Sequence, residues 1–499
     1  MQVLMSERKS TPQTRRRVAI IGAGFSGICT AIHLRKSALY DFAVFEKAPS
    51  IGGTWRDNSY PGAVCDVPSV SYSYSFAMKL DWSRKWSPQP EILAYLESCA
   101  RKYDVYRQIR FGTEIAHAEF DAERSVWVLT TDKGDVHEAD ILITGTGQLS
   151  RPSLPEIPGR EQFAGPQFHS SRWDHGVDLE GKRIAVIGSA ASAVQLVPEI
   201  ARDAARVSVF QRTPNWILPM GNRTHTESEI DRWTKHPWLA RLHRWWIYLS
   251  FEARWPLFKG NRTMQKMAQQ FAERNLEEIV RNPDLRRALT PDYPLGSRRL
   301  LASDHFLPAL TRENVDLITE NIDHIDADGI VTADGKKILA DILVLATGFR
   351  STEFLAPMEI IGRDGKSLEN SWRDGAEAYL GLTVPGFPNF FMMYGPNTNL
   401  GHNSIIFMIE CQTAYIMDCL RQMDERNLAA LDLKSDVMKR FNQKIQQELE
   451  KTVFAQAERS WYKTAAGKIT NNWSTTTIRY WLQTRRVNLA DYATRTRTN

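Results

Sequence analysis

The chain has 499 residues, of which 42% are hydrophobic and 24% are charged, a composition typical of a globular protein with room for two or three domains. Its formal net charge of +5 is too small for this length to indicate a nucleic-acid partner, although it suits an anionic ligand. The five cysteines form no C-x-x-C pair and no cluster with zinc spacing, which predicts no metal site and a reducing, cytoplasmic location.

The N-terminal residues 1–16 are polar and basic. They predict a flexible tail rather than a secretory signal, because they lack an apolar centre. No later window holds the roughly 18 uncharged apolar residues of a membrane-spanning helix, so we expect no integral membrane segment.

The first predicted unit is a strand, a glycine turn and a helix in "VAIIGAGFSGICTAIHL". Gly22 permits the tight turn, Gly24 lets the backbone approach a pyrophosphate, and Gly27 lets the helix pack closely on the strand. The next strand ends in Glu46, about 20 residues further on, where a carboxylate accepts hydrogen bonds from ribose hydroxyls. The unit predicts an FAD site, with a ligand-free glycine turn as the alternative.

The second predicted unit repeats this pattern after a strand at residues 183–187. Its turn has Gly188, but Ala190 and Ala193 replace the second and third glycines, and the methyl group of Ala190 weakens the expected contact with a pyrophosphate. The following strand ends in Arg212 instead of an acid. A guanidinium there suits the 2′-phosphate of NADPH, although a solvated surface charge is the alternative.

A return strand follows each unit, at residues 140–147 and 341–349, as if the chain crossed twice between two domains. We therefore predict an α/β fold with two Rossmann-like dinucleotide-binding domains, one for FAD and one for NADP, and a helical insertion in the NADP domain. The expected boundaries are residues 17–150 and 349–499 for the FAD domain with an active-site segment, 151–215 and 297–348 for the NADP domain, and 216–296 for the insertion.

The insertion shows helical apolar spacing and is rich in tryptophan. Its helices could pack on the NADP domain and wall an apolar substrate pocket. Alternatively, a basic aromatic helix could lie on a membrane surface. The tryptophans concerned are Trp233, Trp238, Trp245, Trp246 and Trp255.

The connection between the two units holds Phe163, Gly165, His169, Trp173 and Asp174 at fixed offsets. This pattern resembles the fingerprint of type I Baeyer–Villiger monooxygenases, whose relatives that oxidise nitrogen or sulfur carry Tyr or Phe where Trp173 stands. The resemblance extends to the C-terminal region and includes "GGTW", "YPGAVCDVPS", "QRTPNW", "GSRRL", "ATGF", "GPNTNLGHNS" and "SWY".

The resemblance implies an enzyme in which NADPH reduces FAD, and O2 then gives a flavin peroxide that inserts one oxygen atom into a ketone to form an ester or lactone. It implies that Arg299 is the catalytic arginine and that Asp66 orients it near the flavin. Arg298 takes the place of a lysine that binds the 2′-phosphate. In the family His169 couples movement of the two domains; a hydrogen-bonded structural histidine is the alternative. For the Arg298–Arg299 pair the alternative is a solvated turn.

The remaining implied contacts are with the two dinucleotides. Trp461 resembles a tryptophan on a mobile segment over the nicotinamide, although "KTAAGKITNNWS" after it departs from the family pattern. Asn403 or Ser404 is expected to cap a helix that starts near Ile405. The full set of expected cofactor contacts is Gly22, Gly24, Phe25, Ser26, Gly27, Glu46, Lys47, Gly53, Thr54, Trp55, Asp66, Tyr72, Ile115, Gly188, Ser189, Ala190, Ala191, Ser192, Ala193, Gln195, Arg212, Thr213, Arg298, Ile405 and Trp461.

Other functions remain possible on the same fold. They are oxygenation of nitrogen or sulfur, a non-oxygenating NADPH-flavin oxidoreductase, and a protein that keeps flavin only as a structural ligand. Trp173, Asp66 and Arg299 together favour ketone oxidation. The aromatic insertion suggests a bulky apolar ketone. We expect a monomer or a homodimer.

Overall fold

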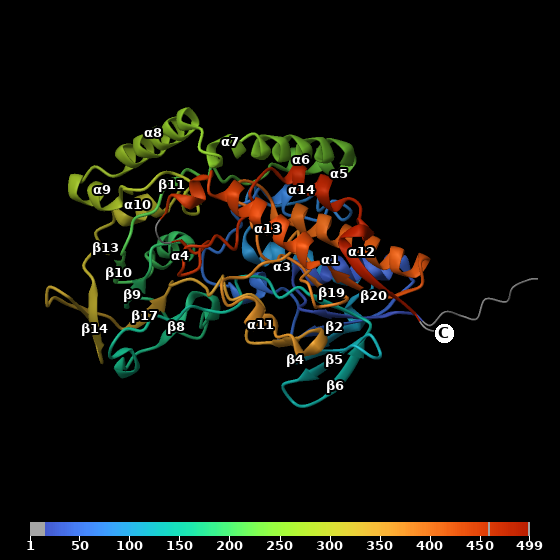
Figure 1. Cartoon of the computed structure of the whole chain (residues 1–499). Coiled ribbons are helices and arrows are strands. Elements are labelled where there is room, and N and C mark those ends of the chain that lie inside the picture. The colour runs from blue at the N-terminus through green and yellow to red at the C-terminus, as the bar shows by residue number, and fades with distance from the viewer. Residues whose placement is uncertain (1–14, 458–459, 498–499) are drawn as a thin grey trace, which may run out of the picture.

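The computed structural model describes residues 15–457 and 460–497, and two parallel sheets organise it (Figure 1). Residues 1–14 of the expected tail lie outside the described residues. Arg16, which the sequence placed in the tail, is buried; its guanidinium donates hydrogen bonds to Asp424 at 2.5 Å and to the carbonyl of Leu428 at 2.6 Å. The folded part of the chain therefore begins before the first strand.

The first sheet has five strands in the spatial order β19-β7-β1-β2-β3, and every neighbouring pair is parallel. The apolar run before the first glycine turn forms its central strand, which is buried from Val18 to Ile21 because other elements cover both faces of the sheet. The strands are β1 (Arg17–Ile21), β2 (Asp41–Glu46), β3 (Ile109–Phe111), β7 (Ile141–Thr144) and β19 (Phe390–Met392).

The second sheet also has five parallel strands, in the order β13-β10-β9-β17-β8. Both sheets place the strand before the glycine turn at the centre, so they are two copies of one architecture. The strands are β8 (Gln167–His169), β9 (Arg183–Ile187), β10 (Arg206–Phe210), β13 (Val315–Ile318) and β17 (Ile342–Leu345). The expected strand ending in Arg212 is shorter than predicted: β10 ends at Phe210, and Arg212 lies in the following loop.

The chain passes from the first sheet to the second between β7 and β8 and returns between β17 and β19. The two connections touch: the backbone N–H of Ser153 donates to the carbonyl of Gly348 at 2.8 Å, and Pro152 pairs with Phe349. The first sheet is thus built from two separate parts of the sequence, with the second sheet inserted between them. After the sequence prediction, we call the first sheet and the elements packed on it the FAD side, and the second sheet with its elements the NADP side.

Smaller sheets and further helices cover the two main sheets. The smaller sheets are β18-β4-β5-β6, β14-β15-β16, β11-β12 and β20-β21, made of β4 (Ile115–Asp121), β5 (Val126–Thr131), β6 (Val136–Ala139), β11 (Ile217–Leu218), β12 (Leu301–Ala302), β14 (Ile322–Asp326), β15 (Gly329–Thr332), β16 (Lys337–Leu339), β18 (Glu359–Ile361), β20 (Leu428–Leu433) and β21 (Tyr492–Thr496). The helices outside the insertion are α1 (Phe25–Ser37), α2 (Thr54–Asp57), α3 (Gln89–Lys102), α4 (Ala191–Ile200), α10 (Phe306–Leu310), α11 (Leu368–Ser371), α12 (Ile405–Glu425), α13 (Ser435–Leu449) and α14 (Thr477–Thr484).

The tryptophan-rich insertion is helical and runs along one edge of the molecule (Figure 1). Its helices are α5 (Glu227–Lys235), α6 (Pro237–Glu252), α7 (Trp255–Phe258), α8 (Arg262–Ile279) and α9 (Pro283–Leu289). A break at His236 separates the first two, because Pro237 cannot continue a helix but fits the first turn of the next one. Arg244 anchors α6 to the FAD side, where its guanidinium donates to the carbonyls of Val70 and Ser73 at 2.7 and 2.8 Å.

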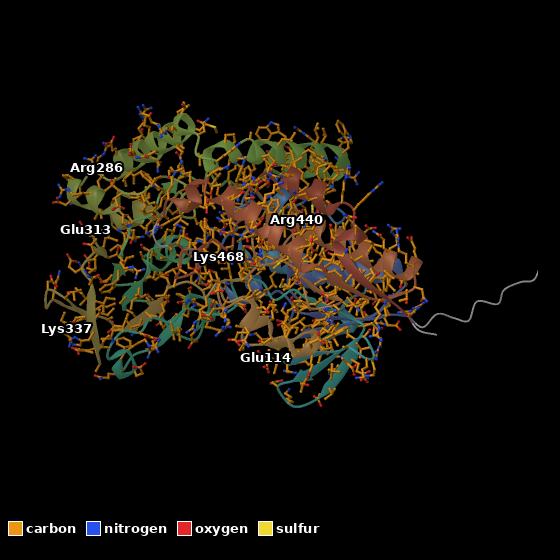
Figure 2. All side chains as sticks on the ribbon, viewed as in Figure 1. Glu114, Arg286, Glu313, Lys337, Arg440 and Lys468 are labelled. Atoms are coloured by element: carbon orange, nitrogen blue, oxygen red, sulfur yellow. The ribbon has the colours of Figure 1, made fainter. Side chains whose placement is uncertain are left out.

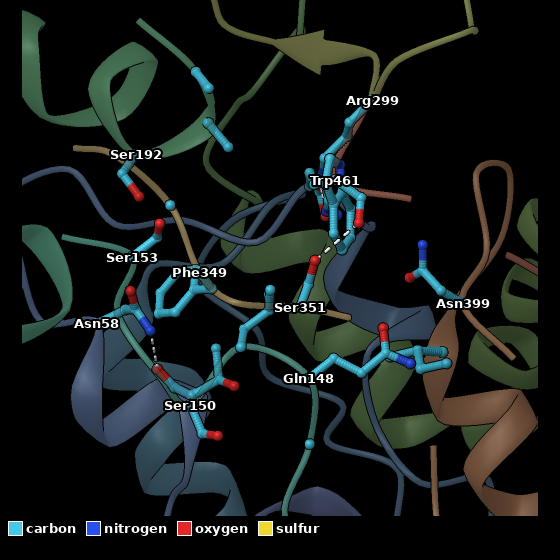
Figure 3. Close-up of a pocket in the computed structure, with 18 of the residues that line it drawn as sticks. Asn58, Gln148, Ser150, Ser153, Ser192, Arg299, Phe349, Ser351, Asn399 and Trp461 are labelled. Atoms are coloured by element: carbon cyan, nitrogen blue, oxygen red, sulfur yellow. Dashed lines mark hydrogen bonds and ion pairs between the residues drawn. The ribbon is translucent and has the colours of Figure 1, made fainter. Parts of the chain in front are cut away.

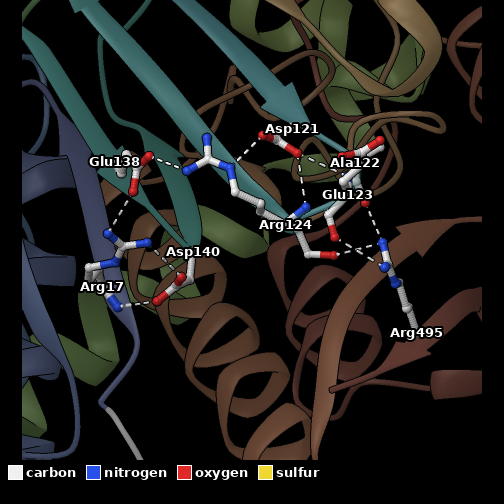
Figure 4. A network of polar contacts seen from close by, with 9 residues as sticks. Arg17, Asp121, Ala122, Glu123, Arg124, Glu138, Asp140 and Arg495 are labelled. Atoms are coloured by element: carbon white, nitrogen blue, oxygen red, sulfur yellow. Dashed lines mark hydrogen bonds and ion pairs between the residues drawn. The ribbon is translucent and has the colours of Figure 1, made fainter. Parts of the chain in front are cut away.

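Charged residues such as Glu313, Lys337 and Arg440 are exposed at the surface (Figure 2), and a cluster of other charged side chains joins distant segments. Arg17 of β1 contacts Glu138 of β6 at 3.2 Å, and the same carboxylate accepts a hydrogen bond from Arg124 at 2.5 Å (Figure 4). Arg495 of β21 donates to the carbonyl of Ala122 in the neighbouring turn. This network ties the C-terminal strand to the edge of the FAD-side sheets, but such exposed pairs add little stability.

We expect His33 of α1 to make folding stability sensitive to acid. Burial, with a smaller contribution from Lys36, lowers the pKa of His33 from 6.5 to about 4. The unfolded chain therefore binds a proton that the folded chain excludes, so stability falls as the pH drops below 6.5. Between about pH 7 and about pH 5, the wild type should lose up to about 2 kcal/mol of unfolding free energy through His33, and His33→Gln should not show this loss.

Urea denaturation of both proteins at the two pH values measures the effect. His236→Gln, which replaces an exposed imidazole, serves as the control. An equal loss of stability in wild type and His33→Gln would contradict the assignment.

Candidate active site

A cavity of about 2220 Å³ lies where the carboxyl ends of both parallel sheets meet. This volume is more than twice the roughly 300–1,000 Å³ of a site for one small ligand, so it has room for two dinucleotides and a substrate. Almost all the expected site residues line this cavity, namely Gly22, Gly24, Phe25, Ser26, Glu46, Lys47, Gly53, Thr54, Trp55, Asp66, Tyr72, Ile115, Gly188, Ser189, Ala190, Ala191, Ser192, Gln195, Arg212, Thr213, Arg298, Arg299, Ile405 and Trp461.

Two expected contacts, Gly27 and Ala193, are absent from the described residues that line the cavity. A Cβ atom on Gly27 would lie 1.9 Å from the carbonyl oxygen of Gly22. Ala193 is fully buried between its helix and the sheet. The small third residue of each motif therefore serves helix–strand packing and does not touch the cavity.

The two turns have nearly the same backbone. Gly22 and Gly188 have φ values of +100° and +109°. A Cβ atom at Gly22 would lie 2.7 Å from the carbonyl oxygen of Gly145, and one at Gly188 would lie 2.4 Å from that of Ala346, each just after a return strand. Gly24 and Ala190 have ordinary φ values of −85° and −90°. The alanine in the second turn therefore causes no backbone strain, and its methyl group only reduces the space available to a ligand.

Glu46 is buried and already holds three donors. Its carboxylate accepts hydrogen bonds from the backbone N–H groups of Ala23 at 2.8 Å and Ala48 at 3.0 Å, and from Arg56 at 3.1 Å. A carboxylate has about four acceptor positions, so one remains for a ribose hydroxyl. The protein contacts fix Glu46 in place beside the first glycine turn.

Arg299 and Asp66 meet in the cavity, as Figure 3 shows for Arg299. The Nε of Arg299 donates to Oδ2 of Asp66 at 3.1 Å, and a second bond joins Nη2 to the same oxygen. The Asp66 carboxylate raises the pKa of Arg299 further above its usual value, so the guanidinium stays charged. About one third of the Arg299 side chain remains exposed to the cavity, so the charge is both oriented and available.

Trp461 lies beside this pair. The Arg299 guanidinium is 6.0 Å from the centre of the indole ring, a distance at which a cation and an aromatic face attract. The carbonyl of Trp461 accepts a hydrogen bond from Ser351 at 2.8 Å (Figure 3) and a second one from Asn471 at 3.2 Å. Trp461 is thus fixed beside the cavity by Ser351 and by Asn471, which belongs to the segment that departs from the family pattern.

Several polar residues outside the expected set also line the cavity. The hydroxyl of Tyr394 donates to Asn399 at 2.6 Å, and Gln148 donates to the carbonyl of Tyr394 at 3.0 Å. Tyr462 also lines the cavity, and burial raises its pKa to about 12. Asn399 and Tyr462 lie inside quoted motifs, but only their contacts across the chain show that they belong to the site.

On the NADP side, Arg212 and Arg298 both reach the cavity. Arg212 is exposed and takes part in no ion pair among residues 15–457 and 460–497. Arg298 stacks over Tyr293 at 4.4 Å, and its Nε is buried without a hydrogen-bond partner in the described part of the chain. A buried unpaired donor is costly, so this site fits an anionic group such as a phosphate.

Gln195, another expected contact, has polar atoms that are already occupied. Its Oε1 accepts from the Tyr60 hydroxyl at 2.8 Å, and its Nε2 donates to the carbonyl of Val64 at 3.0 Å. Gln195 thus joins α4 to the segment that holds Tyr60 and Val64, and all three residues line the cavity.

His169 lies outside the set of described residues that line the cavity. Burial lowers its pKa, so the ring is neutral; Nδ1 accepts from the Ser171 backbone at 3.1 Å, and Nε2 donates to the carbonyl of Gly348 at 3.0 Å. The histidine therefore joins the outgoing connection between the sheets to the returning one. This position suits a positioning role better than direct proton transfer.

The long helix α12 starts at Ile405, as expected, and Ser404 is its N-cap. The Ser404 hydroxyl accepts from the backbone N–H of Ile406 at 3.3 Å and donates to the carbonyl of Ser71 at 3.0 Å. Since Ile405 lines the cavity, the positive end of the helix dipole faces the FAD side of the site.

Comparisons with known proteins agree with this geometry. A family model described as flavin-binding monooxygenase-like matches residues 15–227. A Baeyer–Villiger monooxygenase of Pseudomonas aeruginosa is 41% identical over 98% of this chain and 94% of its own length, and one of Streptomyces coelicolor is 40% identical over 95% and 92%. Among solved structures, a steroid monooxygenase bound to NADP has a TM-score of 0.87 at 30% identity over 97% of this chain and 100% of its own. OTEMO in complex with FAD and NADP has a TM-score of 0.88 at 27% identity over 96% and 99%.

Two dinucleotide-binding sheets that share one cavity with a charged arginine define an NADPH-dependent flavoprotein monooxygenase, with FAD and NADP(H) as its cofactors. Within this class, the chain belongs to the Baeyer–Villiger monooxygenase family. Such enzymes take a ketone and O2 as co-substrates. Two further observations hold for the described residues: no helix has both the length and the apolar character that a bilayer crossing requires, and no group of three or more His, Cys, Asp or Glu could hold a metal ion.

Proposed function

We propose that Arg299 is the catalytic residue and that Asp66 positions it. With FAD bound, NADPH and O2 supply the reducing power and the oxygen atom that is inserted next to the ketone carbonyl. The chain's own contribution is a permanent positive charge, held by Asp66 on one side and exposed to the cavity on the other. Such a charge stabilises the negative oxygen that develops during insertion.

We propose that the first glycine turn and Glu46 hold FAD, while the second turn, Arg212 and Arg298 hold NADP(H). The free guanidinium of Arg212 and the unpartnered Nε of Arg298 support this assignment of the 2′-phosphate. Trp461 would cover the nicotinamide side, beside Arg299. We also propose the domain boundaries expected from the sequence: those at residues 150 and 348 lie between strands of the two main sheets, and those at 215 and 296 enclose the helices of the insertion.

We propose that the substrate is a bulky apolar ketone. The insertion contributes apolar side chains to the cavity wall, including Phe251, Leu257 and Phe258.

We propose a reducing, cytoplasmic location, with which the five buried free cysteines are compatible. We also propose that the protein is a monomer or a homodimer.

The observation that carries the proposal is the Arg299–Asp66 pair inside the shared cavity. The test is to incubate the FAD-loaded protein with NADPH, air and a panel of cyclic, aryl and long-chain ketones, and to follow products by mass spectrometry. We expect ketones to gain one oxygen atom as esters or lactones, with the bulky apolar members reacting best. Oxidation of amines and sulfides alone, with no ester, would contradict the proposal.

A further inference from the structure

Helix α6 of the insertion has an apolar stripe that faces away from the molecule. Its residues recur with the spacing of one helical face, and each side chain is between 54% and 65% exposed. The opposite side of the helix is buried through Ala240, Ile247 and Phe251. The exposed members are Trp238, Leu242, Trp245, Trp246 and Leu249.

Helix α14, which is bonded to α6, has exposed apolar residues of its own. The two helices lie side by side in Figure 1, and the hydroxyls of Tyr248 and Thr477 join them at 2.8 Å. On α14, Ile478, Trp481 and Leu482 are 42–49% exposed. We call these three residues and the five of α6 the tryptophan face.

The exposure of these indole rings stands out among the tryptophans of the described residues. Other tryptophans, such as Trp82 and Trp127, are almost fully buried, whereas Trp238, Trp245 and Trp246 are more than half exposed. Side chains project outward along the whole of α6 (Figure 2). Contiguous exposed apolar residues mark interaction sites, and tryptophan, with an apolar ring and a polar N–H, favours the boundary between lipid and water.

The charges around the tryptophan face indicate what it contacts. Arg241, Arg485 and Arg486 are exposed, and none of them appears in an ion pair within residues 15–457 and 460–497. The only carboxylate on either helix, Glu252, is buried. Within these two helices the face is therefore apolar and flanked by cations, while the exposed carboxylates of Glu227 and Asp231 lie on the neighbouring α5. In a symmetric dimer through this face the same arginines of two copies would come together, whereas an anionic lipid surface would neutralise them.

We propose that the tryptophan face binds peripherally to anionic lipid bilayers, with α6 and α14 lying in the headgroup region. Phe251, on the inner side of α6, lines the active-site cavity, so one helix would contact lipid outside and substrate inside. Apolar ketones concentrate in bilayers, and this arrangement holds the enzyme next to that supply. The proposal goes beyond the oxygenation reaction and does not depend on it.

Vesicle flotation of the full-length holoenzyme tests the proposal. The vesicles are phosphatidylcholine alone, or phosphatidylcholine with about one third phosphatidylglycerol. We expect the wild type to float with the anionic vesicles, and to do so less as salt rises from about 0.1 M, where the Debye length is about 10 Å. A chain carrying Trp238→Ser, Trp245→Ser and Trp246→Ser should lose at least about tenfold in vesicle partitioning.

Matched variants separate the face from general surface effects. Leu39→Ser, Leu154→Ser and Leu339→Ser remove exposed apolar side chains elsewhere and should float as the wild type does. A chain with Arg241→Gln, Arg485→Gln and Arg486→Gln should bind anionic vesicles at least about tenfold more weakly. Its control, with Arg281→Gln, Arg312→Gln and Arg426→Gln, loses the same charge from exposed sites away from the face.

All the substituted side chains are exposed, so each variant should fold. FAD content and the thermal unfolding midpoint check this. The proposal is overturned if the wild type does not float, or if the tryptophan variant floats equally well. It is also overturned if sedimentation shows a wild-type dimer that the tryptophan substitutions dissociate while vesicles bind neither form, since the face would then join two copies of this chain.

Discussion

Arg299→Ala is expected to lower ester formation by about 100- to 1,000-fold, the usual effect of removing a group that stabilises a developing oxyanion. The substitution removes the one charge that Asp66 orients into the cavity. The side chain is one third exposed and bonded to a single carboxylate, so the fold and FAD binding should survive. The measurement is the rate of ester formation by gas chromatography, beside the absorption spectrum of bound flavin and the rate of NADPH oxidation.

Arg299→Lys is the matched control for charge. A lysine keeps the positive charge but cannot form two bonds from one planar group, so it should retain more activity than alanine and less than wild type. Asp66→Asn should also slow ester formation, and by less in the Arg299→Ala background than alone, because the two residues act as a pair. Ester formation at the wild-type rate in Arg299→Ala would exclude this arginine from the reaction.

Arg212→Ala is expected to raise the KM for NADPH by roughly 10- to 150-fold, corresponding to the ~1.5–3 kcal/mol of a hydrogen bond to a charged group. The KM for NADH, which lacks the 2′-phosphate, should stay nearly constant, so the preference between the two cofactors collapses. Arg298→Ala should act in the same direction, because it removes the buried Nε that has no partner in the described part of the chain. Steady-state kinetics with both nucleotides measure the effect.

Two controls accompany this experiment. Arg298→Lys keeps the charge and should restore most of the preference for NADPH. Arg202 lies just beyond the end of α4, is exposed, and pairs with Glu199 at 2.7 Å. Arg202→Ala should therefore change neither KM. An equal rise in the KM for NADH and NADPH would show that the arginines shape the loop without reading the phosphate.

The parts of the fold that depend on neighbours in sequence were predictable. The strands before both glycine turns, the start of α12 and the helical insertion all appear where apolar periodicity and turn residues placed them. A small difference arose at an element end, because β10 stops at Phe210, before Arg212. Boundaries are set by caps and tertiary contacts, which a local pattern does not contain.

The assembly of the site was visible only through resemblance. Asp66 and Arg299 are 233 positions apart, and no period or spacing in the sequence relates them. The imidazole of His169 bonds the carbonyl of Gly348, 179 positions further along the chain. Because that contact directs the side chain to the returning connection, this fingerprint residue lies outside the described cavity wall. The same applies to Gly27 and Ala193, whose motif positions suggested cofactor contact but which pack a helix on a strand.

By itself the sequence determined that two dinucleotide-binding units exist, because a glycine at a left-handed turn and an apolar strand before it are local requirements. Only the tertiary structure decided which side chains share the cavity and which tryptophans face outward on α6 and α14. The physical reason is that amphipathic periodicity shows two faces of a helix but not which of them another element covers. That choice depends on the packing of segments hundreds of residues apart.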